Sequence, residues 1–209
     1  TVETHRLTAA NPAYTVRGPQ SALDTGRTYF VLGVEHILGG IDHLLFVLAL
    51  LLLISDWRML LKTITAFTVA HSITLTGASV GLLSLPQAPV EIAIALSIVF
   101  VALEVVKRKP GRKRLTERCP WVIAFLFGLL HGFGFAGALS EIGLPRKDVP
   151  LALVSFNLGV EAGQILFVGA ILLIVGIAKR VSPVAPARVQ LAVAYLIGIA
   201  ATYWLFERL

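Results

Sequence analysis

The sequence predicts an all-α, polytopic membrane protein built as a bundle of about six transmembrane helices. Of its 209 residues, 56% are hydrophobic and 14% are charged, and the mean hydropathy is +0.83. A soluble domain of this length cannot bury that much apolar surface. The apolar residues fall into six runs, each near the roughly 20 residues that a spanning helix needs. The single cysteine, Cys119, excludes an internal disulfide and Cys-rich metal sites.

The chain divides into a polar start and an apolar remainder. Residues 1–28 contain Pro12 and Pro19, which are typical of loops, and predict an extracytoplasmic N-terminal segment. Residues 29–209 form the predicted six-helix transmembrane domain. The chain begins with Thr rather than Met, so we expect a trimmed start, with cleavage of a signal peptide as one explanation. The predicted spans cover residues 29–54, 60–83, 89–106, 120–140, 151–178 and 188–206.

Basic residues predict the orientation in the membrane. Twelve of the 18 Lys and Arg residues fall in connections on one side, seven of them within Lys107–Arg118. Positive residues mark the cytoplasmic face, so both termini are expected outside. In a bacterium, this describes a multi-pass protein of the inner (cytoplasmic) membrane with its termini in the periplasm. The net charge of +6 therefore reports topology rather than a nucleic-acid partner.

The first span carries a dense group of ionisable residues, Glu35-His36-Ile37-Leu38-Gly39-Gly40-Ile41-Asp42-His43. Ionisable side chains in hydrocarbon usually mark a functional pathway. His36 and His43 share a helix face, but a straight helix separates them by roughly 10 Å along its axis. Either the Gly39–Gly40 pair breaks the helix so that both bind one ion, or each binds with residues of other helices. A structural alternative is that the glycines allow close helix packing and the histidines hydrogen-bond across helices.

Later spans add further polar groups. His71 lies beside a Ser/Thr stripe that is by itself ordinary helix–helix hydrogen bonding. Glu91 opens the third span and fits an interfacial residue equally well, whereas His131 lies among glycines in the fourth span. Asn157 and Glu161 share a face of the fifth. Counting about 1.5 Å per residue from the outer helix ends places the histidines, Asn157 and Glu161 in the outer half of the bilayer.

A weaker pattern indicates an internal repeat. The first and fourth spans each combine a histidine with glycines, and the segment from Phe67 to His71 parallels the segment from Phe156 to Glu161. A three-plus-three repeat would be inverted, as is common in transporters. The alternative is that the similarity is accidental.

These motifs resemble the HupE/UreJ family of small bacterial membrane proteins, which are regarded as nickel or cobalt permeases. The resemblance covers residues 29–206 and implies six to eight spans, with metal ligands in the first, second and fourth. After Gly132 the chain lacks the further His and Glu of the hydrogenase-associated members. It is therefore similar to the divergent second branch, and nickel specifically is not implied. The matching motifs are His36-x5-Asp42-His43, Phe67-x3-His71-Ser72, Glu91, and His131-Gly132-x-Gly134.

The leading hypothesis is a transporter rather than an enzyme: a permease that moves a divalent transition-metal ion (Ni, Co, Zn or similar) from periplasm to cytoplasm. Neutral imidazoles would donate to the ion, and carboxylates would offset its desolvation. The expected partners are the metal ion, the lipid bilayer and a periplasmic metal-binding protein. The candidate metal ligands are His36, Asp42, His43, His71, His131, Glu91 and Glu161.

Three other functions stay open at this point. An intramembrane metal-dependent hydrolase could use a His/Asp-bound Zn with an open position for water. Paired histidines also suit a bis-histidine haem, which a colourless purified protein would exclude. The third is a membrane scaffold for a periplasmic partner. The chain has no GxxxxGK[ST] motif, so ATP hydrolysis by this chain is not expected.

Overall fold

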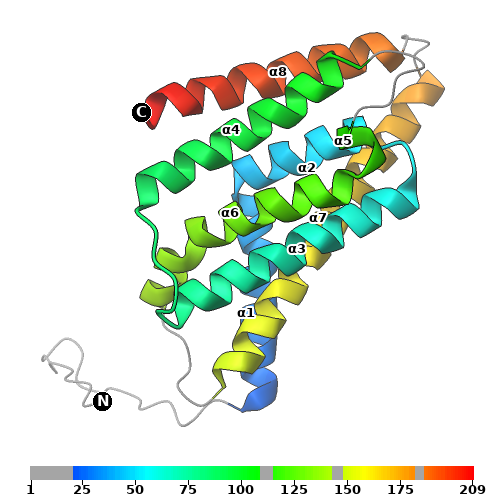
Figure 1. Cartoon of the computed structure of the whole chain (residues 1–209). Coiled ribbons are helices and arrows are strands. Elements are labelled where there is room, and N and C mark those ends of the chain that lie inside the picture. Colours follow the sequence, from blue (N-terminus) through cyan, green and yellow to red (C-terminus); the bar gives the residue numbers. More distant parts are fainter. Residues whose placement is uncertain (1–20, 109–114, 143–147, 182–185) are drawn as a thin grey trace, which may run out of the picture.

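The computed structural model describes residues 21–108, 115–142, 148–181 and 186–209, and every regular element within them is a helix (Figure 1). The predicted all-α class is therefore confirmed. Residues 1–20 of the predicted N-terminal segment and 109–114 of the basic connection lie outside the described ranges. The helices are α1 (Ala22–Gly39), α2 (Ile41–Leu53), α3 (Trp57–Ser79), α4 (Gln87–Val106), α5 (Leu115–Arg118), α6 (Pro120–Ile142), α7 (Val149–Val181) and α8 (Pro186–Glu207).

Length and composition identify the helices that can cross a membrane. In the described part of the chain, α4, α7 and α8 each pass this test alone, and the bent pair α1–α2 counts as a fourth span. The apolar stretch of α6 within the residues searched, Pro120–Gly134, is shorter than the length required by this test. The fold is therefore an α-helical membrane bundle, with three to four spans supported by helix length and hydropathy alone.

Local sequence signals explain where several helices begin. The Ser21 hydroxyl accepts a hydrogen bond from the Asp24 N–H at 3.2 Å, and the Asp56 carboxylate accepts one from the Met59 N–H at 3.1 Å. Such caps satisfy backbone donors that have no partner inside the helix. Pro120 occupies the first position of α6, where its missing N–H costs nothing.

The predicted first span is broken into two helices at Gly40. The axes of α1 and α2 differ by 73°, and Gly40 has extended backbone angles, φ −85° and ψ 95°. A Cβ at Gly40 would lie 2.7 Å from His43 Nδ1 and 3.0 Å from the His36 carbonyl oxygen, so the tight bend requires a residue without a side chain. Of the two alternatives for this span, the broken helix is the one observed.

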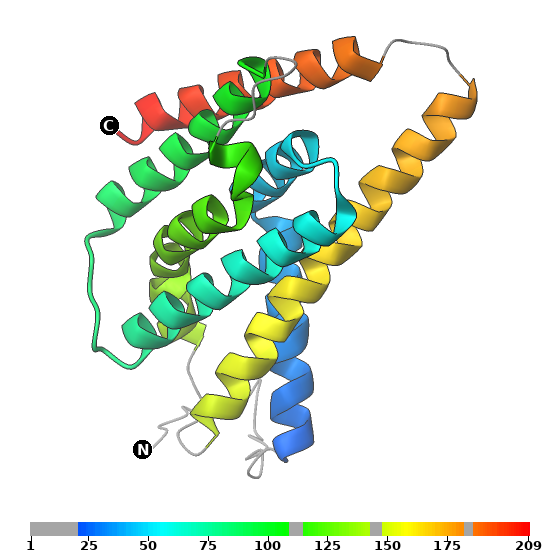
Figure 2. The same cartoon turned by 45° about the vertical axis from the view of Figure 1, so that its right-hand side comes forward.

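The bundle is organised by three helix pairs: α1 and α7 run parallel, α3 and α6 run parallel, and α4 and α8 run antiparallel (Figures 1 and 2). Two clusters of buried apolar side chains hold it together. One cluster joins α2, α3, α4, α6, α7 and α8 around Phe46, Phe67 and Ile98. The other joins α1, α7 and the C-terminal part of α3 around Ile37 and Phe156. The histidine rings contact phenylalanines of both clusters, so they lie between them.

The same close helix contact occurs twice in the bundle. A Cβ at Gly33 of α1 would overlap the carbonyl oxygen of Phe156 in α7, and one at Gly128 of α6 would lie 2.5 Å from the carbonyl oxygen of Phe67 in α3. In each case a histidine follows the glycine by three residues, His36 in α1 and His131 in α6. Phe67 and Phe156 are the residues that the predicted repeat aligns, so the packing agrees with a relation between the two halves.

Candidate metal centre

Three histidines from three helices form a group that could hold a metal ion. His36 comes from the end of α1, His43 from the start of α2, and His71 from the middle of α3. One ligand nitrogen from each lies within 4.8 Å of the others. The bend at Gly40 creates this group, because it brings the His36 and His43 ring centroids to 4.7 Å. A straight helix would leave the two rings too far apart to share an ion.

His131 of α6 lies next to this group. Its ring centroid is 5.1 Å from that of His43, and its side chain is fully buried. Gly132 lets α6 approach this closely, because a Cβ there would overlap the Thr74 hydroxyl and the His71 carbonyl oxygen on α3. We call the four residues His36, His43, His71 and His131 the histidine cluster.

Hydrogen bonds orient the rings of His43, His131 and His71. The Nδ1 atom of His43 lies 3.0 Å from Asp42 Oδ1, and Nδ1 of His131 lies 2.8 Å from the Phe127 carbonyl oxygen. A carboxylate and a carbonyl can only accept, so each neutral ring carries its proton on Nδ1. The lone pair is then on Nε2, the arrangement found in metal-ligating histidines whose other nitrogen donates to an oxygen.

Asn157 gives His71 the same orientation, a role that the sequence analysis did not identify. The Asn157 Nδ2 donates to the Leu153 carbonyl at 2.8 Å, which leaves Oδ1 facing His71 Nδ1 at 3.3 Å. The sequence does place Asn157 on the same face of its helix as Glu161, which marks it as a candidate polar residue of the site. The sequence does not predict the register between α3 and α7, and this register brings Asn157 to His71.

Three of the cluster's Nε2 atoms lack a hydrogen-bond partner in the described part of the chain. Those of His43, His71 and His131 are buried and make no hydrogen bond there. Leaving a buried polar atom without a partner costs about 1–3 kcal/mol, and each such case in a folded protein calls for an explanation. A cation bound between the rings would satisfy these lone pairs, so the donor set fits a metal ion that prefers imidazole.

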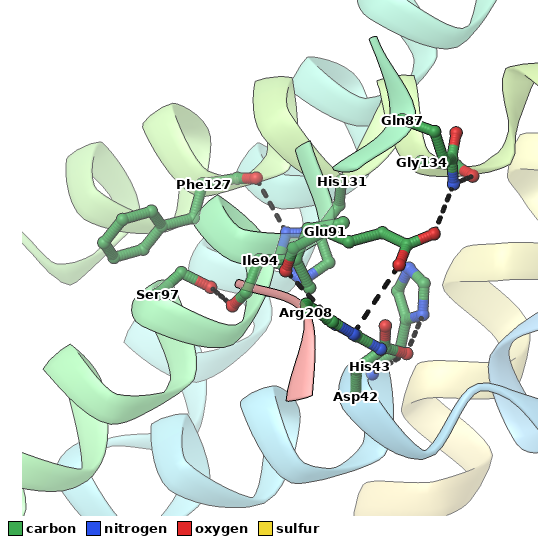
Figure 3. A network of polar contacts seen from close by, with 10 residues as sticks. All are labelled: Asp42, His43, Gln87, Glu91, Ile94, Ser97, Phe127, His131, Gly134 and Arg208. Carbon is green, nitrogen blue, oxygen red and sulfur yellow. Dashed lines mark hydrogen bonds and ion pairs between the residues drawn. The ribbon is translucent and has the colours of Figure 1, made fainter. Parts of the chain in front are cut away.

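A cavity of about 150 Å³ opens beside the histidine cluster. Asp42 and Glu91 contribute carboxylates to its wall, and Arg208 contributes a guanidinium group (Figure 3). Asp42 orients His43 through its ring and its backbone N–H, at 3.0 and 2.9 Å. The Glu91 carboxylate accepts a hydrogen bond from the Gln87 amide rather than from a histidine (Figure 3). Both carboxylates thus border the cluster and lie outside the group of three.

Glu161 has a different position. Its Oε1 accepts a hydrogen bond from the Thr65 hydroxyl at 2.6 Å, six residues before His71 on α3. Between Thr65 and His71 on α3, the Thr68 hydroxyl donates to Gln164 Oε1 at 3.0 Å. Together with the His71–Asn157 contact, these bonds form three polar links between α3 and α7, which we call the α3–α7 ladder.

A model of the family described as HupE / UreJ protein matches residues 13–208. The chain belongs to the HupE/UreJ family. Neither a curated protein nor a solved structure matches it. The three histidines that this HupE/UreJ protein brings together belong to the motifs on α1–α2 and α3, and the motif on α6 supplies the adjacent His131.

Replacing Asn157 with leucine should weaken metal binding by about 10–100-fold, because partners of this kind around metal ligands typically contribute that much. Leucine has a similar size but cannot accept a hydrogen bond from His71 Nδ1. The His71 ring would therefore lose its fixed tautomer. Zn²⁺ titration of the purified protein measures the effect. Ser155→Ala, a buried polar position two residues earlier on α7, is the matched control and should bind like the wild type. Equal affinities for both variants would show that Asn157 does not orient a ligand.

Proposed function

We propose that this protein is a membrane permease that carries a divalent transition-metal ion from the periplasm to the cytoplasm through the histidine cluster. The observation that carries this proposal is the convergence of His36, His43 and His71 on one point, with a buried, unpartnered Nε2 on His43 and His71. His131 is the fourth candidate donor, and membership in a family regarded as nickel or cobalt permeases supports transport as the role of the ion.

The donor set indicates the class of ion. Imidazole nitrogens suit Zn, Ni, Co and related ions, whereas Mg and Ca prefer oxygen ligands. The nearby Asp42 carboxylate adds a negative charge that offsets part of the ion's desolvation. The proposed substrate is therefore Ni²⁺, Co²⁺ or Zn²⁺. Glu91 and Glu161 act before and after the cluster in this scheme rather than as its ligands.

The proposed topology has six spans: the bent pair α1–α2, followed by α3, α4, α6, α7 and α8. Residues 1–28 and the C-terminus would lie in the periplasm, and the basic connections would lie in the cytoplasm of a bacterium. The positive-inside distribution of Lys and Arg supports this orientation. The repeated glycine contact at Gly33 and Gly128 supports a two-fold relation between the halves, with the histidine cluster between them.

The α3–α7 ladder provides a route away from the cluster. Along α3 the links run from His71 through Thr68 to Thr65, in the direction of the basic end of that helix. Their partners on α7 are Asn157, Gln164 and Glu161. A cation that leaves the histidines would meet hydroxyl and amide oxygens and then a carboxylate. These are ligands of moderate strength, as a conduction path requires if the ion is to leave again.

A second function is favoured by one observation. The 150 Å³ cavity beside the histidine cluster could hold a water molecule on a bound Zn²⁺, as in an intramembrane hydrolase. The two functions differ in the fate of the ion, because a hydrolase keeps its metal and a permease releases it on the other side.

Metal uptake by reconstituted protein tests the proposal. Proteoliposomes that enclose a metal-sensitive dye should accumulate Zn²⁺, Co²⁺ or Ni²⁺ faster than protein-free liposomes, and more so with an inside-negative potential. Stoichiometric, tightly bound metal with no accumulation of any of the three ions would instead favour the hydrolase.

Replacing Glu161 with glutamine should slow this uptake by about tenfold while the metal affinity of the purified protein stays within about twofold. A hydrogen-bonded charged group contributes about 1.5–3 kcal/mol, and about 1.4 kcal/mol corresponds to a factor of ten in rate. The control is Glu35→Gln, an exposed carboxylate on α1. If Glu161→Gln transports like Glu35→Gln, the ladder is not the exit route.

A further inference from the structure

Arg208 lies in the wall of the cavity beside the histidine cluster. Helix α8 ends at Glu207 and runs antiparallel to α4, so the next residue reaches the first turns of α4 (Figure 1). The Arg208 Nη1 donates to the backbone carbonyl of Glu91 at 3.1 Å, and its Nε lies 3.7 Å from Glu91 Oε2. The Arg208 side chain is 25% exposed, so the guanidinium is partly withdrawn from solvent.

The partner of Arg208 is held in a fixed position. Gln87 donates to Glu91 Oε1 at 2.8 Å and to the Gly134 carbonyl at 3.2 Å. Because Gly134 follows His131 by three residues on α6, Gln87 ties Glu91 to the helix that carries the fourth histidine. Figure 3 shows the Glu91 carboxylate between Gln87 and Arg208, beside His43.

The charges around the cavity match a divalent cation only when Arg208 is excluded. Asp42 and Glu91 supply two negative charges, and Arg208 supplies one positive charge. With Arg208 in place, these three groups carry a net charge of −1, and the guanidinium repels a cation that approaches Glu91. Without it, the two carboxylates balance one doubly charged ion. A divalent ion is attracted to Glu91 twice as strongly as a monovalent ion at the same distance, so it competes better with the guanidinium.

We propose that Arg208 is a tethered counter-ion that occupies Glu91 in the metal-free protein and is displaced from it by an entering divalent cation. Arg208 and Glu91 then form a gate that selects ions by their charge. The histidines afterwards select among divalent ions by the element. This inference rests on the proposed function, since it takes the histidine cluster as the destination of the ion. The alternative is that the ion pair only fastens α8 to α4.

Zn²⁺ titration of purified protein, carrying an affinity tag without histidine, distinguishes the two. Arg208→Gln should bind Zn²⁺ about tenfold more tightly than the wild type, since the ion no longer has to displace a cation; effects of this size are usual for coupled sites. Arg208→Lys keeps the charge and should bind within about twofold of the wild type. Arg108→Gln, which removes an ion pair with Glu117 in another part of the chain, is the matched control and should leave the affinity unchanged.

Trp204 reports the displacement directly. The Arg208 guanidinium carbon lies 5.8 Å from the centre of the Trp204 ring. With Trp57→Phe and Trp121→Phe, Trp204 is the only tryptophan, and Zn²⁺ does not quench it. The emission of Trp204 should change over the same Zn²⁺ range as binding, and this change should disappear when Arg208→Gln is added.

The outcomes distinguish a failure of the Arg208–Glu91 gate from a failure of the metal centre. If the wild type binds Zn²⁺ but Arg208→Gln binds it equally well, or if the Trp204 response survives in that variant, the gate is wrong and the metal centre stands. If the wild type binds no Zn²⁺ by equilibrium dialysis and elemental analysis, the proposed metal centre is wrong and the gate with it. Circular dichroism of each variant verifies that the helices are intact.

Discussion

Replacing His71 with alanine should reduce Zn²⁺ affinity by more than about 100-fold and abolish metal uptake. His71 is the fully buried member of the group of three, and Asn157 orients its ring. Residues that merely orient a ligand contribute about 10–100-fold to metal affinity, so the loss of the ligand itself should exceed that range. The measurements are Zn²⁺ titration of the purified protein and dye-reported uptake in proteoliposomes.

The neighbouring residue provides the control for His71. Ser72→Ala removes a hydroxyl that donates to the Thr68 carbonyl of the same helix at 2.7 Å, and it should bind and transport like the wild type. Size-exclusion chromatography in detergent establishes that both variants remain folded. If His71→Ala retains the affinity of Ser72→Ala, His71 is a buried packing residue and not a ligand.

The second large effect is expected at the helix break. Gly40→Ala places a methyl group 2.7 Å from His43 Nδ1 and 3.3 Å from Asp42 Oδ1, the two atoms that orient the His43 ring. The ring must turn or the bend must open, and either change separates His43 from His36. We expect metal affinity to fall by about 10–100-fold, the range for lost orientation of a ligand.

The adjacent glycine, Gly39, provides the matched control for this prediction. A Cβ at Gly39 would meet nothing within 4 Å, so Gly39→Ala should stay within about twofold of the wild type in the same titration. The two variants carry the same added methyl group one residue apart. Equal losses in both would mean that general helix stiffening, rather than crowding at His43, controls the site.

Composition and hydropathy were sufficient to predict the helical membrane class, because apolar runs of spanning length have few other uses. They could not decide how α1 and α2 are joined. A helical period describes a straight helix. The surroundings that leave no room for a side chain at Gly40, namely His43, Asp42 and the His36 carbonyl, come together only after folding. The sequence therefore left open whether His36 and His43 meet.

The histidines of the site could be predicted from the sequence, but the contacts that orient them could not. Ionisable residues in hydrocarbon are rare enough to be identified individually. The contact of Asn157 with His71 joins residues 86 apart, and the contact of Arg208 with Glu91 joins residues 117 apart. These pairings follow from the register of α7 against α3 and of α8 against α4, which a single sequence does not encode in any local pattern.

X-ray absorption spectroscopy of the Zn²⁺-loaded protein tests the central claim most directly. If the histidine cluster holds the ion, the spectrum will show nitrogen or oxygen neighbours at about 2.0–2.1 Å, with the multiple scattering of at least three imidazole rings. In His71→Ala, one ring should be lost from this signal. A shell of oxygen ligands without imidazole scattering would contradict the account, because the ion would then be bound somewhere other than among His36, His43, His71 and His131.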